Sequence, residues 1–208
     1  MMSGLTRRQG LILAGAAAIW PTGFALADDG PAYADIAGQL PDLQFEMTLA
    51  STGVTVTAAN FAGHPAILYF GFTRCTDTCP LTMENAAKLV RKMGTAGQQL
   101  RVLFVTIDPV YDTPMVLKKY MTNFGPAPVF DGLCGTNTQL AALARRYGVE
   151  YSAVTSADAP DPVAGITHSD AVYGFGPSGK AHYILGTLAQ GKADIDLVAG
   201  LMKPLVKA

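Results

Sequence analysis

Two cysteines four residues apart, Cys75 and Cys79, lie where an apolar run gives way to a segment of helix-favouring composition. The run 66–72 is short and rich in strand-forming residues, and 81–93 is expected to be the helix. The thiols therefore lie near a helix N-terminus, where backbone amides and the neighbouring Arg74 favour a thiolate. We expect at least one of them to be more nucleophilic, and to bind metal more strongly, than an ordinary thiol.

The spacing of these cysteines leaves two chemistries open. On a regular helix, C-x-x-x-C places the Cβ atoms about 5–6 Å apart, which is wider than the about 3.5–4.5 Å of a disulfide. Both thiols can then face one metal ion, although a flexible loop still allows them to close a disulfide. The third cysteine, Cys134, precedes Gly135 in a loop without a second ligand, and we interpret it as a small buried apolar side chain.

The first residues have the pattern of an export signal. Arg7 and Arg8 precede the apolar run 11–20, and the A-x-A sequence at 25–27 is typical of a cleavage site. We expect residues 1–27 to be a signal peptide that is removed in the periplasm. Its arginine pair resembles a twin-arginine signal, although ordinary secretory signals also contain adjacent arginines. The alternative is an uncleaved segment that anchors the protein in the inner membrane, facing the periplasm.

Composition limits the kind of partner. Removal of residues 1–27 leaves 181 residues with 13 basic and 16 acidic side chains, and no basic run for nucleic acid. We expect a flexible lead at 28–42 and then one domain at 43–208, acting as a monomer. In an oxidising compartment, a free dithiol persists only if a reductant or a bound metal protects it.

The remaining pattern alternates strands and helices. Two turn signals predict hairpins, at 50–53 and 176–180. This order is that of an α/β, thioredoxin-like fold with an N-terminal β-hairpin and a β-hairpin insertion. The expected strands are 44–49, 54–57, 66–72, 100–107, 129–130, 149–154, 171–175 and 181–185, and the expected helices are 81–93, 113–123, 137–147 and 194–202.

A third candidate ligand follows from this topology. The segment 156–167 has the composition of an irregular loop and brings His168 to the start of the next strand, which in a thioredoxin-like sheet lies beside the thiol loop. Two thiolates and an imidazole suit Cu(I) as three ligands, and Cu(II) with a fourth. Zinc can use the same ligand set.

Other side chains that could do chemistry have simpler structural explanations. We interpret His64 as a turn residue and His182 as a partly exposed strand residue. Met83 is expected to be a core side chain rather than an axial ligand. Asp112 precedes Thr-Pro and is expected to cap the next helix, whereas Asp108 can approach the metal loop from its strand end.

Several motifs occur together over residues 40–205: Phe70-Gly71-Phe72-Thr73-x-Cys75-x-Asp77-x-Cys79-Pro80, Thr106-Ile107-Asp108-Pro109-x-x-Asp112-Thr113-Pro114, Gly132-Leu133-x-Gly135, Tyr147-Gly148-Val149 and His168-Ser169. Their order resembles that of the Sco (SenC) family of copper-delivery proteins. That resemblance implies a thioredoxin-like fold, copper bound by Cys75, Cys79 and His168, and delivery to the binuclear copper site of cytochrome c oxidase. Thr76 stands where many members have proline, and a cleavable signal differs from their common membrane anchor.

Two classes of function therefore compete. In the first, the protein is a metallochaperone and not an enzyme, and it passes copper to the copper-bearing oxidase subunit, with other periplasmic copper chaperones as further partners. In the second, it is a thiol-disulfide oxidoreductase with Cys75 and Cys79 as its catalytic pair, reducing cysteines of an oxidase subunit or another exported protein. His168 separates the two, because a thiol exchanger does not need it as a ligand.

Overall fold

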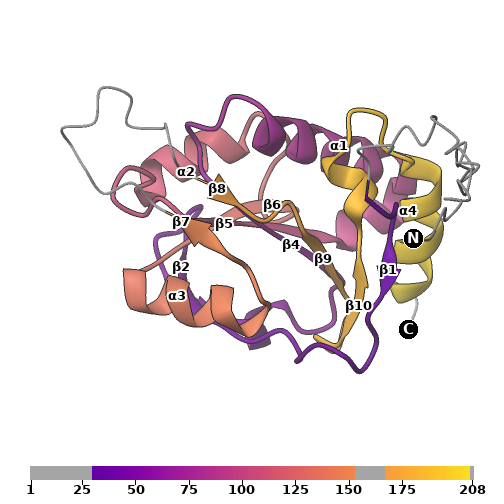
Figure 1. Cartoon of the computed structure of the whole chain (residues 1–208), viewed down its shortest axis with the longest axis horizontal. Helices are drawn as coiled ribbons and strands as arrows, with labels where there is room; N and C mark the ends of the chain where they lie inside the picture. Colours follow the sequence, from indigo (N-terminus) through magenta and orange to yellow (C-terminus); the bar gives the residue numbers. More distant parts are fainter. Residues whose placement is uncertain (1–29, 153–166, 207–208) are drawn as a thin grey trace, which may run out of the picture.

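The structure, a computed structural model, describes residues 30–152 and 167–206. The expected signal peptide at 1–27, and most of the loop expected at 156–167, lie outside these residues. The described chain forms an eight-stranded mixed sheet with helices on both sides, and a separate two-stranded sheet (Figure 1). In the part of the chain that the structure describes, no helix combines the length and apolar character needed to cross a membrane.

Three parallel strands form the centre of the sheet, in the order β4 (Ala66–Gly71), β5 (Arg101–Thr106) and β6 (Phe130–Cys134). Every residue of these strands is buried. Nearly continuous apolar runs are typical of parallel strands that are covered on both faces. The predictions at 66–72 and 100–107 are thus confirmed, and the short strand predicted to start at 129–130 is β6, Phe130–Cys134.

Within residues 30–152 and 167–206, four α-helices cover the sheet. Helix α1 (Thr78–Met93) connects β4 to β5, and α2 (Pro114–Met121) connects β5 to β6. Right-handed crossovers that progress in one direction place both helices on the same side. Figure 1 shows them there, with α3 (Asn137–Arg146) on the opposite side. The closing helix α4 (Ile195–Val206) packs against α1.

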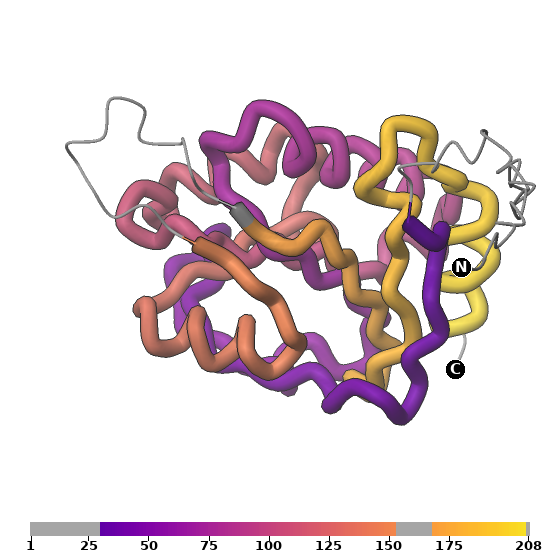
Figure 2. The backbone as a smooth tube through the Cα atoms, in the orientation of Figure 1, coloured from indigo at the N-terminus to yellow at the C-terminus, as the bar shows by residue number. Residues whose placement is uncertain are grey.

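Antiparallel strands complete both edges, and the two predicted hairpins are confirmed. Strands β9 (Val172–Phe175) and β10 (Ala181–Ile184) join the sheet beside β4, and β2 (Glu46–Leu49) and β3 (Thr55–Thr57) join it beside β6. Figure 2 shows the indigo N-terminal segment alongside the β9–β10 hairpin. Short 3₁₀ helices lie at Ala58–Phe61, Gly94–Gln99 and Gly186–Ala189.

Two short strands differ from the sequence predictions. Strand β1 (Ala34–Asp35) lies within residues 28–42, which were expected to be flexible, and it pairs with β10. The adjacent Ile36 is buried. Strand β7 (Tyr151–Ser152) pairs with β8 (Thr167–His168) in the separate sheet, not along an edge of the main one as expected for 149–154. Strands of two residues carry no periodic pattern, so composition alone could not place them.

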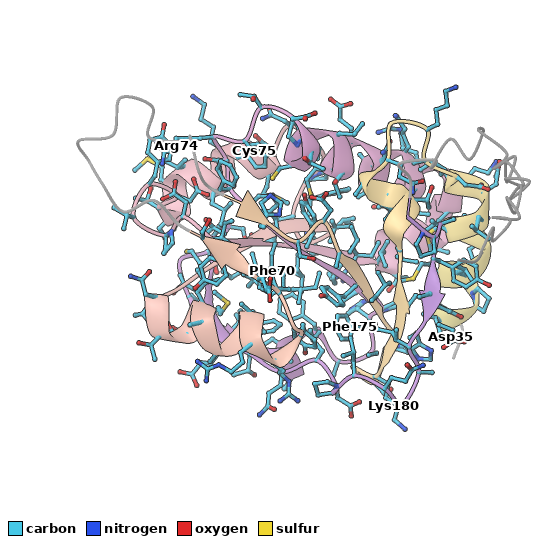
Figure 3. The ribbon with its side chains drawn as sticks, in the orientation of Figure 1. Asp35, Phe70, Arg74, Cys75, Phe175 and Lys180 are labelled. Carbon is cyan, nitrogen blue, oxygen red and sulfur yellow. The ribbon has the colours of Figure 1, made fainter. Side chains whose placement is uncertain are left out.

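The core lies on both faces of the central strands. Figure 3 shows Phe70 and Phe175 in the interior, with Asp35 and Lys180 towards one end of the molecule and Arg74 and Cys75 towards the other. The side chains of Phe70 and Phe175 have no measurable exposure. This packed core holds the end of β4, from which the loop with the two cysteines begins, in a fixed position.

Candidate metal centre

The thiol loop leaves the carboxyl end of β4, beside the equivalent end of β5. Gly71 is in register with Thr106, and the backbone amide of Ile107 donates to the Gly71 carbonyl at 2.8 Å. Because β4 and β5 are parallel, the loops that follow them meet at one edge of the sheet. The cysteine loop, residues 72–77, therefore lies against the β5–α2 connection, residues 107–113.

The two thiols differ in environment. Helix α1 begins at Thr78, so Cys75 lies in the loop and Cys79 in the first helical turn. Cys79 is fully buried and Cys75 is partly exposed, and both are free thiols. The site needs a glycine beneath it, because a Cβ at Gly71 would lie 2.9 Å from the Cys79 Sγ. An incoming group therefore reaches the Cys75 sulfur before that of Cys79.

His168 reaches this edge from the other side of β4. Strand β9 runs antiparallel to β4 with Val172 opposite Tyr69, so the residues before β9 lie near the carboxyl end of β4. The Nε2 atom of His168 is 3.4 Å from the Cys79 Sγ. Its Nδ1 atom is 3.1 Å from the Ser169 carbonyl oxygen, which can only accept a hydrogen bond. In the neutral ring, the proton is thus on Nδ1, and the Nε2 lone pair faces the thiols.

The three predicted ligands converge. The Sγ atoms of Cys75 and Cys79 and a ring nitrogen of His168 lie within 4.8 Å of one another, and the group could hold a metal ion. Free thiols beside an imidazole lone pair form a soft donor set that fits copper, and zinc can also use it. The placement of His168 agrees with the topological argument, and its role as a ligand stays a prediction.

Cys79 does not have the stabilised thiolate that the sequence predicts for at least one of the two cysteines. Burial raises the pKa of this thiol well above its ordinary value, and the backbone contact to Phe72 offsets only part of that effect. The positive charge of Arg74 is paired with Asp108 rather than with a thiolate, because its Nη2 lies 2.6 Å from the Asp108 carboxylate. Its guanidinium carbon also lies 4.3 Å from the ring centroid of Tyr111. Burial has the largest effect on the Cys79 pKa because desolvation penalises the charged thiolate.

Asp112 ties the cysteine loop to the sheet, and its predicted role as a helix cap is wrong. One carboxylate oxygen accepts from the Thr73 amide at 3.0 Å and from the Thr106 hydroxyl at 2.6 Å, while the other accepts from the Thr73 hydroxyl. The cap of α2 is instead Thr113, whose hydroxyl accepts from the Val116 amide. Asp112 is fully buried, and burial raises the pKa of its carboxyl group, while the hydrogen bonds from Thr106 and Thr73 offset part of that effect.

The sequence did not predict that the aromatic side chains of Tyr69 and Phe72 contact the site. The Tyr69 hydroxyl donates to the Cys79 Sγ at 3.8 Å, and burial raises the pKa of Tyr69. The rings of Tyr69 and Phe72 each meet His168 edge-on, with ring centroids 5.9 Å apart. Both aromatic residues lie in the apolar run at 66–72, where only their buried position in a strand was evident.

The remaining candidates are structural, as expected. The Nδ1 atom of His64 donates to the Gln99 carbonyl at 3.0 Å, and its Nε2 accepts from Arg101 at 3.1 Å. His182 is a partly exposed residue of β10, and Met83 is fully buried in the core. Cys134 lies in β6 and not in a loop, and its thiol bonds the Thr48 carbonyl at 3.7 Å.

The fold and the thiol edge define a thioredoxin-like protein, and comparison with known proteins identifies the family. The SCO1/SenC family model matches residues 37–203, and the chain belongs to this family. The "SCO2-like protein" of Rickettsia felis is 32% identical over 136 residues, which cover 65% of this chain and 64% of that protein. The chain matches between 45% and 64% of the length of this relative and two others.

Solved structures agree on the fold. Yeast Sco1 with copper bound is 29% identical with a TM-score of 0.66, and the alignment covers 78% of this chain and 90% of that one. BsSco is 20% identical with a TM-score of 0.62, covering 81% of this chain and 95% of its own. BsSco has a disulfide switch and is a member of the Sco family of cytochrome c oxidase assembly proteins.

Proposed function

We propose that this chain binds one copper ion through Cys75, Cys79 and His168 and delivers it to the binuclear copper site of cytochrome c oxidase. The observation that carries the proposal is the convergence of the three ligand atoms within 4.8 Å. The copper in yeast Sco1 supports the choice of metal over zinc. The family to which BsSco is assigned supports the oxidase as the destination.

Unequal burial of the ligands suits transfer. Cys79 is fully buried and accepts a hydrogen bond from Tyr69, so it is the fixed end of the site. Cys75 is partly exposed, and a ligand of the receiving protein can approach its sulfur directly. Copper is the cargo, and it leaves by stepwise ligand exchange that begins at Cys75 and ends at Cys79.

A second candidate function is thiol-disulfide exchange. The same difference in exposure gives an accessible Cys75 that attacks a substrate disulfide and a buried Cys79 that resolves the mixed disulfide. The substrate gains two electrons and two protons, and the protein is left with a Cys75–Cys79 disulfide that a periplasmic thiol reductant must reduce. The disulfide switch of BsSco supports thiol-disulfide exchange as the second candidate function.

One experiment separates the two functions. A strain that lacks this gene is complemented with His168→Ala, Cys75→Ala or Cys79→Ala, and oxidase activity and copper content are measured. His182→Ala is the matched control, since this half-exposed histidine lies on β10. The metallochaperone requires that His168→Ala fail like the cysteine variants. If His168→Ala restores the oxidase while both cysteine variants fail, thiol exchange is the function.

Export to the periplasm is part of the proposal. The sequence pattern at 1–27 supports it, as does a site whose free thiols need a metal or a reductant in an oxidising compartment. Intact-mass measurement of the exported protein should give a chain that begins at Asp28. A chain that keeps residues 1–27 in the membrane fraction supports the anchored alternative.

A further inference from the structure

Exposed apolar side chains lie on the connection between β5 and α2 and in the first turn of α2. Val110 is 81% exposed, Tyr111 49% and Met115 80%. Only two other large apolar side chains in the described residues are this exposed, Tyr33 and Val54. Three of the five thus fall within six consecutive residues. We call Val110, Tyr111 and Met115 the apolar face.

The apolar face adjoins the cysteine loop. The guanidinium carbon of Arg74, the residue before Cys75, lies 4.3 Å from the ring centroid of Tyr111. The same guanidinium bonds the Asp108 carboxylate at 2.6 Å, and Asp108 lies at the start of the connection. Figure 3 shows Arg74 and Cys75 at the same end of the molecule. A protein that touches Tyr111 is therefore beside the exposed thiol.

Buried hydrogen bonds hold the apolar face and the cysteine loop as one unit. Asp112, which follows Tyr111 directly, binds the Thr73 amide at 3.0 Å and the Thr106 hydroxyl at 2.6 Å. Prolines at 109 and 114 flank the segment and restrict its backbone. Little conformational entropy is then lost on binding, and a protein bound here is held at a fixed position relative to Cys75.

The chemistry of the surface indicates the kind of partner. Ligand exchange brings the partner's copper ligands to Cys75, so the partner must cover the surface around this residue. Arg74 and Asp108 are paired with each other, and the exposed Val110 and Tyr111 follow Asp108 in the chain. Asp77 is an exposed carboxylate of the cysteine loop and makes no side-chain bond as the cap of α1. We infer that the apolar face docks the copper-accepting protein, which presents its own copper ligands within an apolar surface. This inference rests on the proposed function.

The test compares two copper acceptors. The copper-loaded protein is mixed with the copper-free soluble domain of the oxidase subunit, or with the small Cu(I) chelator bathocuproine disulfonate, which needs no docking surface. The double variant Val110→Ser, Met115→Gln should transfer copper to the domain about tenfold more slowly, as for loss of an interface hot spot. Its transfer to the chelator and its copper stoichiometry should match the wild type. Val54→Ser is the control, because this valine is 59% exposed on the β2–β3 turn.

A second readout needs no copper. On addition of the oxidase domain to the copper-free protein, the methyl NMR signals of Val110 and Met115 should shift, and that of Val54 should not. Unchanged transfer to the domain by the double variant overturns the docking inference alone. Slower transfer to the chelator also overturns it, because the variant then acts on the copper site. A wild-type dimer that the double variant dissociates assigns the face to self-association instead. If the wild type loads the chelator but never the domain, the proposed function fails, and this inference with it.

Discussion

The Nε2 atom of His168 lies 3.4 Å from the Sγ of Cys79, although 89 positions separate these residues in the chain. The pairing of β9 with β4 produces this proximity, since the chain before β9 must pass the carboxyl end of β4. Ser169 then orients the ring through its carbonyl oxygen, 3.1 Å from Nδ1. The fixed imidazole of His168 thus adds one harder nitrogen ligand to the two soft sulfur ligands of Cys75 and Cys79.

Replacement of that ligand should separate the two oxidation states of copper. In His168→Ala we expect Cu(II) affinity to fall by more than about tenfold, because the remaining thiolates alone suit Cu(I) better. Only residual Cu(I) binding should remain, and Cys75 and Cys79 should still form a disulfide. Competition titrations with Cu(I)- and Cu(II)-selective chelators measure both affinities. Unchanged affinity for both states is incompatible with a ligand role for His168, and an equal loss for both would show that Cu(I) depends on the imidazole as much as Cu(II) does.

Gly71 should be essential for the position of the buried thiol. A Cβ here would lie 2.9 Å from the Cys79 Sγ and 2.9 Å from two atoms of the Phe104 ring. We expect Gly71→Ala to lower the free energy of unfolding by about 1–3 kcal/mol, as for other overpacked cores, and to weaken copper binding by moving the sulfur. Urea denaturation and copper titration measure the two effects.

Gly200 offers the matched control for that substitution. It lies in α4, and a Cβ there meets nothing within 4 Å. Gly200→Ala should therefore raise stability by about 0.4–1 kcal/mol, because alanine restricts the unfolded chain, and leave copper binding unchanged. If Gly71→Ala behaves like Gly200→Ala, the contact between Gly71 and Cys79 does not position the thiol.

Asp112 should control the cysteine loop without touching the metal. Asp112→Asn places an amide group where one carboxylate oxygen accepts a hydrogen bond from Thr73 or Thr106. The unsatisfied donor should cost about 1–3 kcal/mol of stability, and copper affinity should fall because the loop is no longer tied to β5. Asp77→Asn is the control: Asp77 is exposed and makes no side-chain bond as the cap of α1. Equal effects of the two variants on copper affinity would show that only the charge matters.

Much of the fold was predictable because local signals and tertiary packing agree. The apolar runs that became β4 and β5 are what parallel central strands require, and glycine-containing turns marked both hairpins. The proximity of His168 to the thiols followed from strand order, without any side-chain detail. Strands β1 and β7 escaped prediction because two residues are too few to show a period.

The errors at the site have a common physical origin. Asp112 before Thr-Pro has the local pattern of a cap, but its partner Thr73 is 39 positions away, and only the fold brings them together. Arg74 beside Cys75 suggested a stabilised thiolate, yet its charge is paired with Asp108, 34 positions away. In both cases a long-range partner replaced the local one. Burial then determined the direction of the Cys79 pKa.

Cys134 should be irrelevant to copper and should affect only stability. Its thiol bonds the Thr48 carbonyl within the sheet, in β6, and no second ligand stands beside it among the groups of the described residues that could hold a metal. Cys134→Ser should keep the copper stoichiometry of the wild type, measured by metal analysis of the purified protein. Loss of copper in this variant would contradict the assignment of Cys75, Cys79 and His168.

The stability effect of Cys134 should depend on pH. Burial raises the pKa of its thiol, so the folded state keeps the proton that the unfolded state loses above the ordinary value of about 8.5. The stability linked to this group is complete below that pH and is lost as the pH rises towards the raised folded value. Cys134→Ala removes this contribution, and the unfolding free energy of the variant should decline less steeply above about pH 8.5 than that of the wild type. Urea denaturation on both sides of this pH measures the slopes, with Cys134→Ser as the companion that also lacks the titrating thiol. Parallel slopes in all three proteins would show that the Cys134 thiol titrates alike in the folded and unfolded states.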